Sequence, residues 1–401
     1  MSRKKLILII VIIVAVLGGA IFLFISREGG GGSADRNGSG FLGLFPNNDS
    51  DPGDSFDSSQ STSTPRDGDD QIIPIPTFRQ ISNTPVSGYV VFESGVGSST
   101  IRYIERESGH IFETATSTLA TKRLSNTTIP RIKEVLWFDN GGSLIMRYLD
   151  ESDNIQTFLA KLNKEEGQEL YILESEALPQ NILVGDIFGD DFFAILRVAD
   201  SSKWRIYDNQ GNERNITTNP LKEWLPDFWQ SNTVSIQRKS SNGIPSHLYF
   251  LNTSTVSLEE VLSNISGLTT KTSPDGKYVF YSTSSGSLTL SFIYDTEDET
   301  SSNLSITTLA DKCTWSEDNI LYCGVPNTLG NNLPDNWYQG LTSFNDSLWS
   351  ISPSTLTTSL IFNPQDRGKG VDVVNMEIDN NFLFFINKKD STLWSLDLER
   401  I

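Results

Sequence analysis

The sequence is poor in the residues that build metal and redox sites. Its 401 residues include two cysteines and two histidines, and no C-x-x-C pair occurs. A Cys/His metal site is therefore nearly excluded, and we expect neither a metal nor a cofactor. Basic side chains are also scarce, because 31 Lys and Arg stand against 50 Asp and Glu, a formal net charge of −19. This balance argues against unspecific nucleic-acid binding, which needs clustered positive charge.

The sequence also lacks the common catalytic motifs. G-x-S-x-G, H-E-x-x-H and the phosphate-binding G-x-x-x-x-G-K are all absent. A literal G-x-G-x-x-G at residues 38–43 lies in a glycine-rich stretch with no predicted strand before it and no helix after it, so we reject a dinucleotide site. We therefore expect no catalysis. The many acidic residues leave open a carboxylate pair of the kind that glycoside hydrolases use.

The amino-terminal region differs from the rest of the chain. Residues 6–25 are an apolar run preceded by Arg3, Lys4 and Lys5, which predicts a transmembrane helix at 6–26 with a cytoplasmic tail at 1–5. A cleaved signal peptide is the alternative. Residues 27–71 are rich in Gly, Ser and Asp and predict a disordered tether. Its apolar island, Phe41-Leu42-Gly43-Leu44-Phe45, is either a contact for the membrane or a partner, or a transient cluster.

The stretch from residue 268 to residue 326 contains the same short phrase twice. The copies read Thr272-Ser273-Pro274-Asp275-Gly276-Lys277-Tyr278-Val279-Phe280-Tyr281-Ser282 and Cys313-Thr314-Trp315-Ser316-Glu317-Asp318-Asn319-Ile320-Leu321-Tyr322-Cys323. Each predicts a β-hairpin, because a polar turn is followed by aromatic and β-branched residues in alternation. The hairpin recurs after roughly 40 residues, a period typical of β-propeller blades.

We predict an all-β fold for residues 72–401, a β-propeller of seven four-stranded blades, with six and eight blades as alternatives. The predicted inner strands end near Phe92, Trp137, Ile187, Phe228, Ser273, Trp315 and Met376. An insertion from about 326 to 348 lengthens the sixth blade. The last blade is one strand short, and residues 76–82 are expected to supply its outer strand and close the ring.

These residues resemble a known family. Ser273-Pro274-Asp275-Gly276-Lys277 and Trp315-Ser316-Glu317-Asp318-Asn319 look like the repeats of TolB-like or WD-repeat-like β-propellers. Residues 312–340 are also similar to membrane-anchored bacterial propellers. The resemblance implies a rigid platform for binding. It implies no single activity, because propellers host enzymes, receptors and scaffolds alike.

Cys313 and Cys323 are expected to form a disulfide. They lie on the two strands of the second hairpin, roughly opposite each other, and the compartment outside a membrane is oxidising. Two buried free thiols are the alternative.

Trp337 and Tyr338 lie in the predicted insertion. A long loop in a compact repeat usually has a function, so this aromatic pair is a candidate anchor for a partner or a sugar ring. The alternative is that the pair fastens the loop to its own blade.

Basic residues gather in the connections that lead into the inner strands. They are Arg131, Lys133, Lys222, Lys271, Lys312, Arg367 and Lys369. The turns at the opposite ends of these strands carry acids, among them Asp139 and Asp275. We therefore predict a positive funnel that binds an anionic ligand, either an acidic glycan or the acidic surface of a protein. The alternative is that these charges are only solvated, and that Asp belongs in tight turns for backbone reasons.

Together these features predict a single-pass protein of the bacterial cell membrane. Its amino terminus lies in the cytoplasm, and its propeller lies outside, in the periplasm or at the cell surface. The propeller binds another envelope or surface component without catalysis. A propeller-type carbohydrate-active enzyme is the first alternative, and a purely structural spacer is the second.

Overall fold

The computed structural model describes residues 74–95 and 98–401. The predicted cytoplasmic tail, transmembrane helix and tether lie outside the described residues. Within the part that is described, no helix is both long and apolar enough to cross a bilayer.

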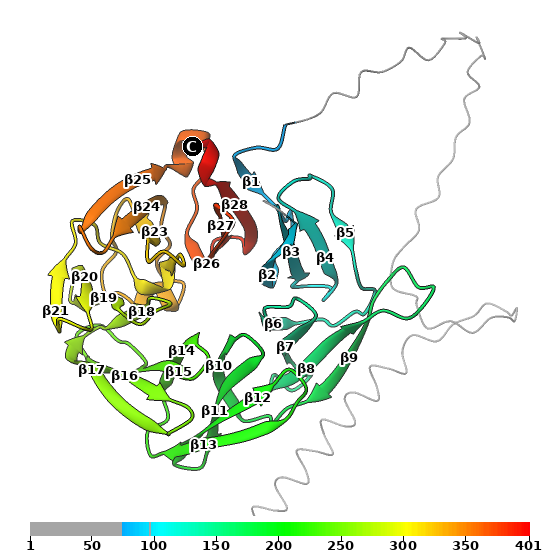
Figure 1. Cartoon of the computed structure of the whole chain (residues 1–401), viewed down its shortest axis with the longest axis horizontal. Coiled ribbons are helices and arrows are strands. Elements are labelled where there is room, and N and C mark those ends of the chain that lie inside the picture. Colours follow the sequence, from blue (N-terminus) through cyan, green and yellow to red (C-terminus); the bar gives the residue numbers. More distant parts are fainter. Residues whose placement is uncertain (1–73, 96–97) are drawn as a thin grey trace, which may run out of the picture. The chain divides into compact units, whose positions relative to one another are not determined.

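The described chain forms a ring of seven four-stranded antiparallel sheets, which confirms the predicted seven-bladed propeller (Figure 1). The inner strands are β2 (Val86–Gly95), β6 (Ile132–Trp137), β10 (Ile182–Phe188), β14 (Trp224–Gln230), β18 (Thr269–Thr272), β22 (Cys313–Trp315) and β26 (Val373–Asp379). The second strands are β3 (Ser98–Glu105), β7 (Ser143–Leu149), β11 (Asp191–Val198), β15 (Thr233–Arg238), β19 (Tyr278–Ser285), β23 (Leu321–Pro326) and β27 (Phe382–Asn387).

The outer half of each blade completes the sheet. The third strands are β4 (Ile111–Ala115), β8 (Ile155–Asn163), β12 (Ser201–Asp208), β16 (Pro245–Asn252), β20 (Leu288–Asp295), β24 (Asp346–Ser352) and β28 (Thr392–Asp397). The outer strands are β5 (Lys122–Arg123), β9 (Ile172–Ala177), β13 (Glu213–Asn219), β17 (Ser257–Ser266), β21 (Thr300–Asn303), β25 (Thr357–Phe362) and β1 (Phe78–Gln80). The short helices are η1 (Ala310–Lys312), α2 (Asp335–Tyr338), η2 (Pro364–Arg367) and η3 (Leu398–Arg400).

The hairpin turns form where the repeated phrase predicted them. In blade 5 the Asp275 carboxylate accepts the Lys277 N–H at 3.0 Å and the Ser273 hydroxyl at 2.7 Å, which fixes the turn between β18 and β19. Gly276 has φ 74°, and a Cβ there would stand 2.6 Å from the Trp229 ring of blade 4. The turn therefore requires glycine for its conformation and for its packing.

The ring closes through the strand that the sequence predicted. β1 pairs antiparallel with β28, with Phe78 opposite Leu396 and Gln80 opposite Trp394. The strand is shorter than the predicted segment 76–82. Because β1 precedes blade 1 in sequence but completes blade 7, the pairing ties the two ends of the propeller together and covers the open edge of the last sheet.

The core lies between neighbouring blades. Phe280 of blade 5 packs in one buried cluster with Trp315 and Ile351 of blade 6. Six other buried clusters of the described chain likewise contain residues of two neighbouring blades. Trp137, Trp315 and Trp394 are each at most 6 % exposed, so these tryptophans contribute to the packing between blades.

The predicted disulfide is present. Cys313 and Cys323 are directly opposite in the β22–β23 ladder, with Cα atoms 4.1 Å apart and an S–S distance of 2.07 Å. The bond links the inner and second strands of blade 6 beside the central channel.

We expect the double variant Cys313→Ser/Cys323→Ser to lose roughly 3 kcal/mol of the free energy of unfolding, by the chain-entropy estimate for a short loop. Urea unfolding of both proteins measures the loss. As a control, dithiothreitol should lower the midpoint of the unaltered protein and leave that of the variant unchanged. Equal midpoints for the two proteins without reductant would contradict the expected contribution.

Candidate functional site

The top face is the end of the propeller that carries the connections from each outer strand to the next inner strand. Because the strands of a blade alternate in direction, the connections between second and third strands lie on this face too. A cavity of about 570 Å³ opens here between the ends of strands from blades 7, 1, 2, 3 and 4. We call it the basic cavity.

Positive side chains dominate the basic cavity. Those that line it are Arg106, Lys133, Arg147, Arg197, Lys222, Lys239 and Lys388, against the two acids Glu134 and Glu223. In a chain of net charge −19 this is a local reversal of sign. A concave surface with such an excess of positive charge concentrates counter-ions and attracts ligands of opposite charge.

Part of this charge is already neutralised within the protein. Arg147 pairs with Glu134 at 2.5 Å, and Lys222 pairs with the exposed Asp200 at 3.1 Å. By contrast, the exposed side chains of Lys133, Arg197 and Lys239 form no ion pair with any residue of the described chain. These three cations remain available to an anionic ligand.

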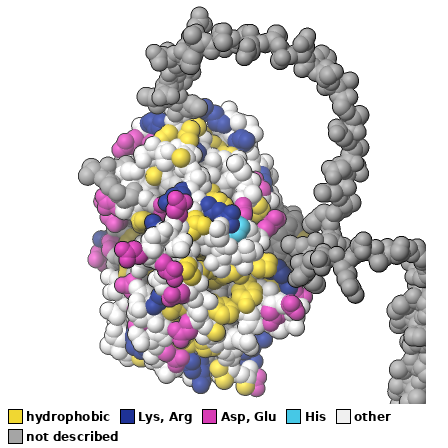
Figure 2. Space-filling model, turned by 90° about the vertical axis from the view of Figure 1, so that its right-hand side faces the viewer, with side chains coloured by type: hydrophobic (Ala, Val, Ile, Leu, Met, Phe, Trp, Pro, Cys, Tyr) yellow, Lys and Arg dark blue, Asp and Glu magenta, His cyan; other side chains and the backbone are white. Residues whose placement is uncertain are grey.

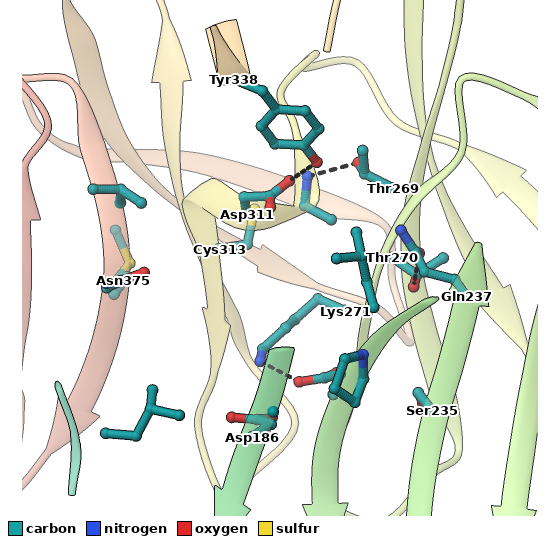
Figure 3. Close-up of a pocket in the computed structure, with 18 of the residues that line it drawn as sticks. Asp186, Ser235, Gln237, Thr269, Thr270, Lys271, Asp311, Cys313, Tyr338 and Asn375 are labelled. Atoms are coloured by element: carbon teal, nitrogen blue, oxygen red, sulfur yellow. Dashed lines mark hydrogen bonds and ion pairs between the residues drawn. The ribbon is translucent and has the colours of Figure 1, made fainter. Parts of the chain in front are cut away.

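A second cavity, of about 470 Å³, lies in the central channel and adjoins the basic cavity through shared walls at Glu134, Asn375 and Lys388. We call it the channel cavity. Figure 3 shows Asp186 and Lys271 near its lower end and the Tyr338–Asp311 pair above them. The two cavities differ in charge. Cationic side chains predominate in the lining of the basic cavity, whereas carboxylates outnumber cations in the lining of the channel cavity.

Two carboxylates of the channel differ in their surroundings. Asp227 forms an ion pair with Lys271, with 2.6 Å between the carboxylate oxygen and the ammonium nitrogen. The Asp186 carboxylate instead accepts a hydrogen bond from the backbone N–H of Phe228 at 2.7 Å. Burial, and then the neighbouring charge of Asp227, raise the pKa of Asp186 to about 6, and the Lys271 ammonium offsets part of the effect. A carboxyl with a raised pKa beside one that is ion-paired is the asymmetry that acid–base catalysis uses.

The predicted insertion in blade 6 spans residues 327–345 between β23 and β24 and folds over the top of the channel. The Asp335 carboxylate accepts the Asn242 N–H at 2.6 Å and the Ser241 hydroxyl at 2.9 Å, both in blade 4. On its other side, the Tyr338 hydroxyl donates to Asp311 at 2.9 Å. The insertion is thus fastened to several blades, and it walls the channel cavity.

Trp337 does not present a surface for a partner, which corrects the role predicted for it. Its side chain is 2 % exposed, and its indole N–H donates to Asp372 at 3.0 Å. The Lys388 ammonium lies 4.0 Å from the ring centre, a cation–π contact. Trp337 therefore fastens the insertion, but to Asp372 and Lys388 at blade 7 and not to its own blade, as the alternative had it. Tyr338 lines the channel cavity, and a role for it in binding stays a prediction.

Lys312 is also buried, which corrects its predicted place in the positive funnel. Its ammonium lies 2.5 Å from Asp372 and 2.7 Å from Asp346, and all three side chains are at most 1 % exposed. Burial raises the pKa of Asp372, but the Lys312 charge and hydrogen bonds from Phe344 and Trp337 outweigh it, so the pKa lies below its ordinary value. The cluster fixes the insertion to the connections on either side of blade 6.

The other predicted basic residues are dispersed. Lys133 and Lys222 line the basic cavity as expected. Lys271 lies in the channel, paired with Asp227, and Arg131 pairs with Asp153. Arg367 and Lys369 line a separate cavity of about 310 Å³ beside Phe78 and Trp394.

Five basic residues of the cavity were missed by the sequence analysis, namely Arg106, Arg147, Arg197, Lys239 and Lys388. Each lies near the end of the second strand of its blade or directly after it. The signal was present in the sequence. The connections between second and third strands share the top face with the connections from outer to inner strands, so the charges of both sets of connections gather at one end of the propeller.

Comparison with known proteins shows the fold alone. No family model matches the chain, and no curated protein matches it by sequence. Among solved structures, an acylaminoacyl peptidase from Pyrococcus horikoshii is similar over 78 % of this chain, at 10 % identity and a TM-score of 0.50. The matched region spans 51 % of that enzyme.

Two further structures are similar over comparable lengths. The β-propeller domain of the Trilobed protease from Pyrococcus furiosus matches 78 % of this chain and 95 % of its own, at 10 % identity and a TM-score of 0.48. TolB from Acinetobacter baumannii matches 77 % of this chain and 79 % of its own, at 12 % identity and a TM-score of 0.39. At such low identity these likenesses carry no information about activity.

Proposed function

We propose that this chain is a membrane-anchored, extracytoplasmic β-propeller that binds an acidic glycan of the cell envelope without catalysis. The observation that carries the proposal is the basic cavity, where seven cationic side chains from five blades surround one concavity of a strongly acidic protein. Its volume of about 570 Å³ lies within the range of ligand sites. A concavity admits a polymer chain more readily than it admits the flat surface of a folded protein.

The proposed location rests on two independent features. The apolar run at 6–25 with basic residues before it supports a membrane anchor whose following domain lies outside the cytoplasm. The Cys313–Cys323 bond supports the same side, because disulfides persist in oxidising compartments and are rare in the cytosol.

Reversing the exposed charges of Lys133, Arg197 and Lys239 should abolish most of the binding. We expect Lys133→Glu/Arg197→Glu/Lys239→Glu to weaken the binding of labelled hyaluronan oligosaccharides, a uronate probe, at least tenfold at low salt. The residual affinity of the variant should depend less on salt than that of the unaltered protein, because exposed charges are screened within about 10 Å at 0.1 M. Fluorescence anisotropy across a salt series measures both effects.

The matched control is Lys122→Glu/Lys164→Glu/Lys277→Glu, which changes the net charge equally at positions away from the cavity. It should bind as the unaltered protein does, and neutral dextran should bind to none of the three proteins. Equal losses in both triple variants would show that only net charge matters. Absence of binding in every protein would instead favour the structural spacer.

A carbohydrate-active enzyme is the second candidate, and the Asp186–Asp227 asymmetry in the channel favours it. In that case Asp186 is the general acid and Asp227 is the base or nucleophile. Asp186→Asn and Asp227→Asn would then each abolish the release of reducing ends from an acidic glycan, while Asp190→Asn, an exposed control, would not. No release by the unaltered protein would exclude this candidate for the glycan used.

A further inference from the structure

The two adjoining cavities of the candidate site have opposite charge balances. Seven basic side chains and two acids line the basic cavity, whereas four carboxylates and two lysines line the channel cavity. On the outer side of the propeller, which Figure 2 shows, acidic and basic side chains are instead interspersed. A ligand that extends from the basic cavity into the channel cavity therefore meets first an excess of positive charge and then an excess of negative charge.

Both lysines of the channel cavity already have partners within the protein. The Lys271 ammonium pairs with Asp227 at 2.6 Å. The Lys388 ammonium donates to the backbone carbonyl of Trp337 and lies 4.0 Å from the centre of the Trp337 ring. Because these contacts occupy the two cations, an anionic group in the channel cavity would have to compete for them.

Two carboxylates of the channel cavity are not neutralised in this way. Asp186 and Asp311 form no ion pair with any residue of the described chain. Asp186 accepts the Phe228 N–H at 2.7 Å, and Asp311 accepts the Tyr338 hydroxyl at 2.9 Å. Each carboxylate has about four lone-pair sites, so it can accept further hydrogen bonds. A ligand hydroxyl can donate to these oxygens, whereas a ligand carboxylate is repelled by them.

The insertion closes the channel cavity on the side away from the basic cavity. Asp335 fixes it to blade 4, the Asn332 N–H donates to the Gly286 carbonyl of blade 5 at 3.2 Å, and the Trp337 indole fixes it to blade 7. Two residues of the insertion line the channel cavity, whereas no described residue of the insertion, of blade 5 or of blade 6 lines the basic cavity. A ligand that enters from the basic cavity is therefore blocked from continuing across blades 5 and 6.

Toward the bottom face the channel becomes more acidic. A further cavity, of about 370 Å³, shares walls with the channel cavity at Glu134, Asp186 and Asn375. Its lining contains four carboxylates and no Lys or Arg of the described chain. An anionic polymer is therefore repelled from passing further through the ring, because each step inward brings it closer to like charges.

We propose that the channel cavity receives one end of the acidic glycan, and that the unit at this end is uncharged and rich in hydroxyl groups. This inference rests on the proposed function, because the anionic units of the same chain then lie in the basic cavity. Ser235, Gln237 and Thr270 add neutral polar groups to the lining of the channel cavity. The two cavities together therefore select an anionic chain with a neutral terminal unit over one with an anionic terminal unit.

Two hyaluronan pentasaccharides test this selection in the full chain at neutral pH and low salt. One has N-acetylglucosamine at both ends and contains two glucuronates, and the other has glucuronate at both ends and contains three. Charge alone favours the second probe, whereas we expect the first to bind at least about five times more tightly, because only its end avoids repulsion in the channel cavity. Isothermal titration calorimetry measures both affinities without a label at either end.

A pair of double variants shows whether the channel carboxylates cause the preference. In Asp186→Asn/Asp311→Asn the probe with glucuronate ends should bind at least as tightly as the other probe. The matched control is Asp298→Asn/Asp318→Asn, which removes the same charge at exposed positions that line none of the three cavities, and it should keep the preference of the unaltered protein.

The outcomes separate this inference from the proposed function. Equal affinities of the unaltered protein for the two probes, tighter binding of the probe with glucuronate ends, or binding of long hyaluronan but of neither pentasaccharide would overturn the inference alone. An unchanged preference in Asp186→Asn/Asp311→Asn would also overturn it. Failure of long hyaluronan to bind would overturn the proposed function, and this inference with it.

Discussion

Replacing Lys312 by Met should cost about 3 to 5 kcal/mol of the free energy of unfolding. The substitution removes the cation that lies between Asp346 and Asp372 and leaves two carboxylates buried without a counter-charge. One oxygen of Asp346, Oδ1, already has no hydrogen-bond partner among the described residues, so the site has little capacity to compensate. Urea unfolding monitored by tryptophan fluorescence measures the loss.

Two further variants separate lost charge balance from lost packing. Adding Asp346→Asn and Asp372→Asn to Lys312→Met should recover part of the stability, because the neutral amides cost less to bury than carboxylates do. Lys277→Met, which removes one partner of the surface pair with Glu297, should change stability little. If Lys312→Met unfolds at the same urea concentration as the unaltered protein, the cluster does not stabilise the insertion.

Replacing Glu377 by Gln should change how stability depends on pH. Glu377 lies in β26 and lines the further cavity of about 370 Å³ together with Asp139. Burial first, and then the charges of Asp379 and Asp139, raise its pKa to about 8 in the folded protein. The folded state therefore holds this proton more tightly than the unfolded state, and Glu377 stabilises the fold fully below pH 4.5 and progressively less as pH rises to about 8.

The unaltered protein should accordingly lose stability from this group between pH 5 and pH 8, by at most about 1.4 kcal/mol per pH unit. In Glu377→Gln this loss is absent, so the variant should be more stable than the unaltered protein at pH 9 and nearly equal to it at pH 5. Urea midpoints at pH 5, 7 and 9 measure the difference. The exposed Glu107→Gln serves as control, and a constant difference between Glu377→Gln and the unaltered protein at all three pH values would contradict the assignment.

Much of the fold could be predicted because its signals are local. The turn at Asp275 and Gly276 is specified by residues that are adjacent in sequence, and the alternation after it specifies a strand with one buried face. Once two hairpins are placed one blade apart, the opposition of Cys313 and Cys323 follows from the register of a single hairpin. The closing strand β1 was also predictable, because a last blade with three strands requires a fourth from elsewhere in the chain.

The candidate site could be predicted only in part, because its residues come from five blades. Lys133 and Arg197 are far apart in sequence and share one cavity only once the ring is closed. The sequence also could not distinguish a solvated lysine from a buried one. Lys312 reads as a charge in a surface connection, yet two carboxylates from later in the chain enclose it.

The sequence by itself determined the repeating blade, the disulfide, the closing strand and the position of the insertion, since each depends on backbone conformation and on residues close together in the chain. Only the tertiary structure decided which charges face solvent. The insertion folds back across the channel, so Trp337 becomes part of the core while Lys133, Arg197 and Lys239 stay exposed around one cavity. Burial and electrostatic environment depend on which segments pack together in space, and no local pattern specifies that.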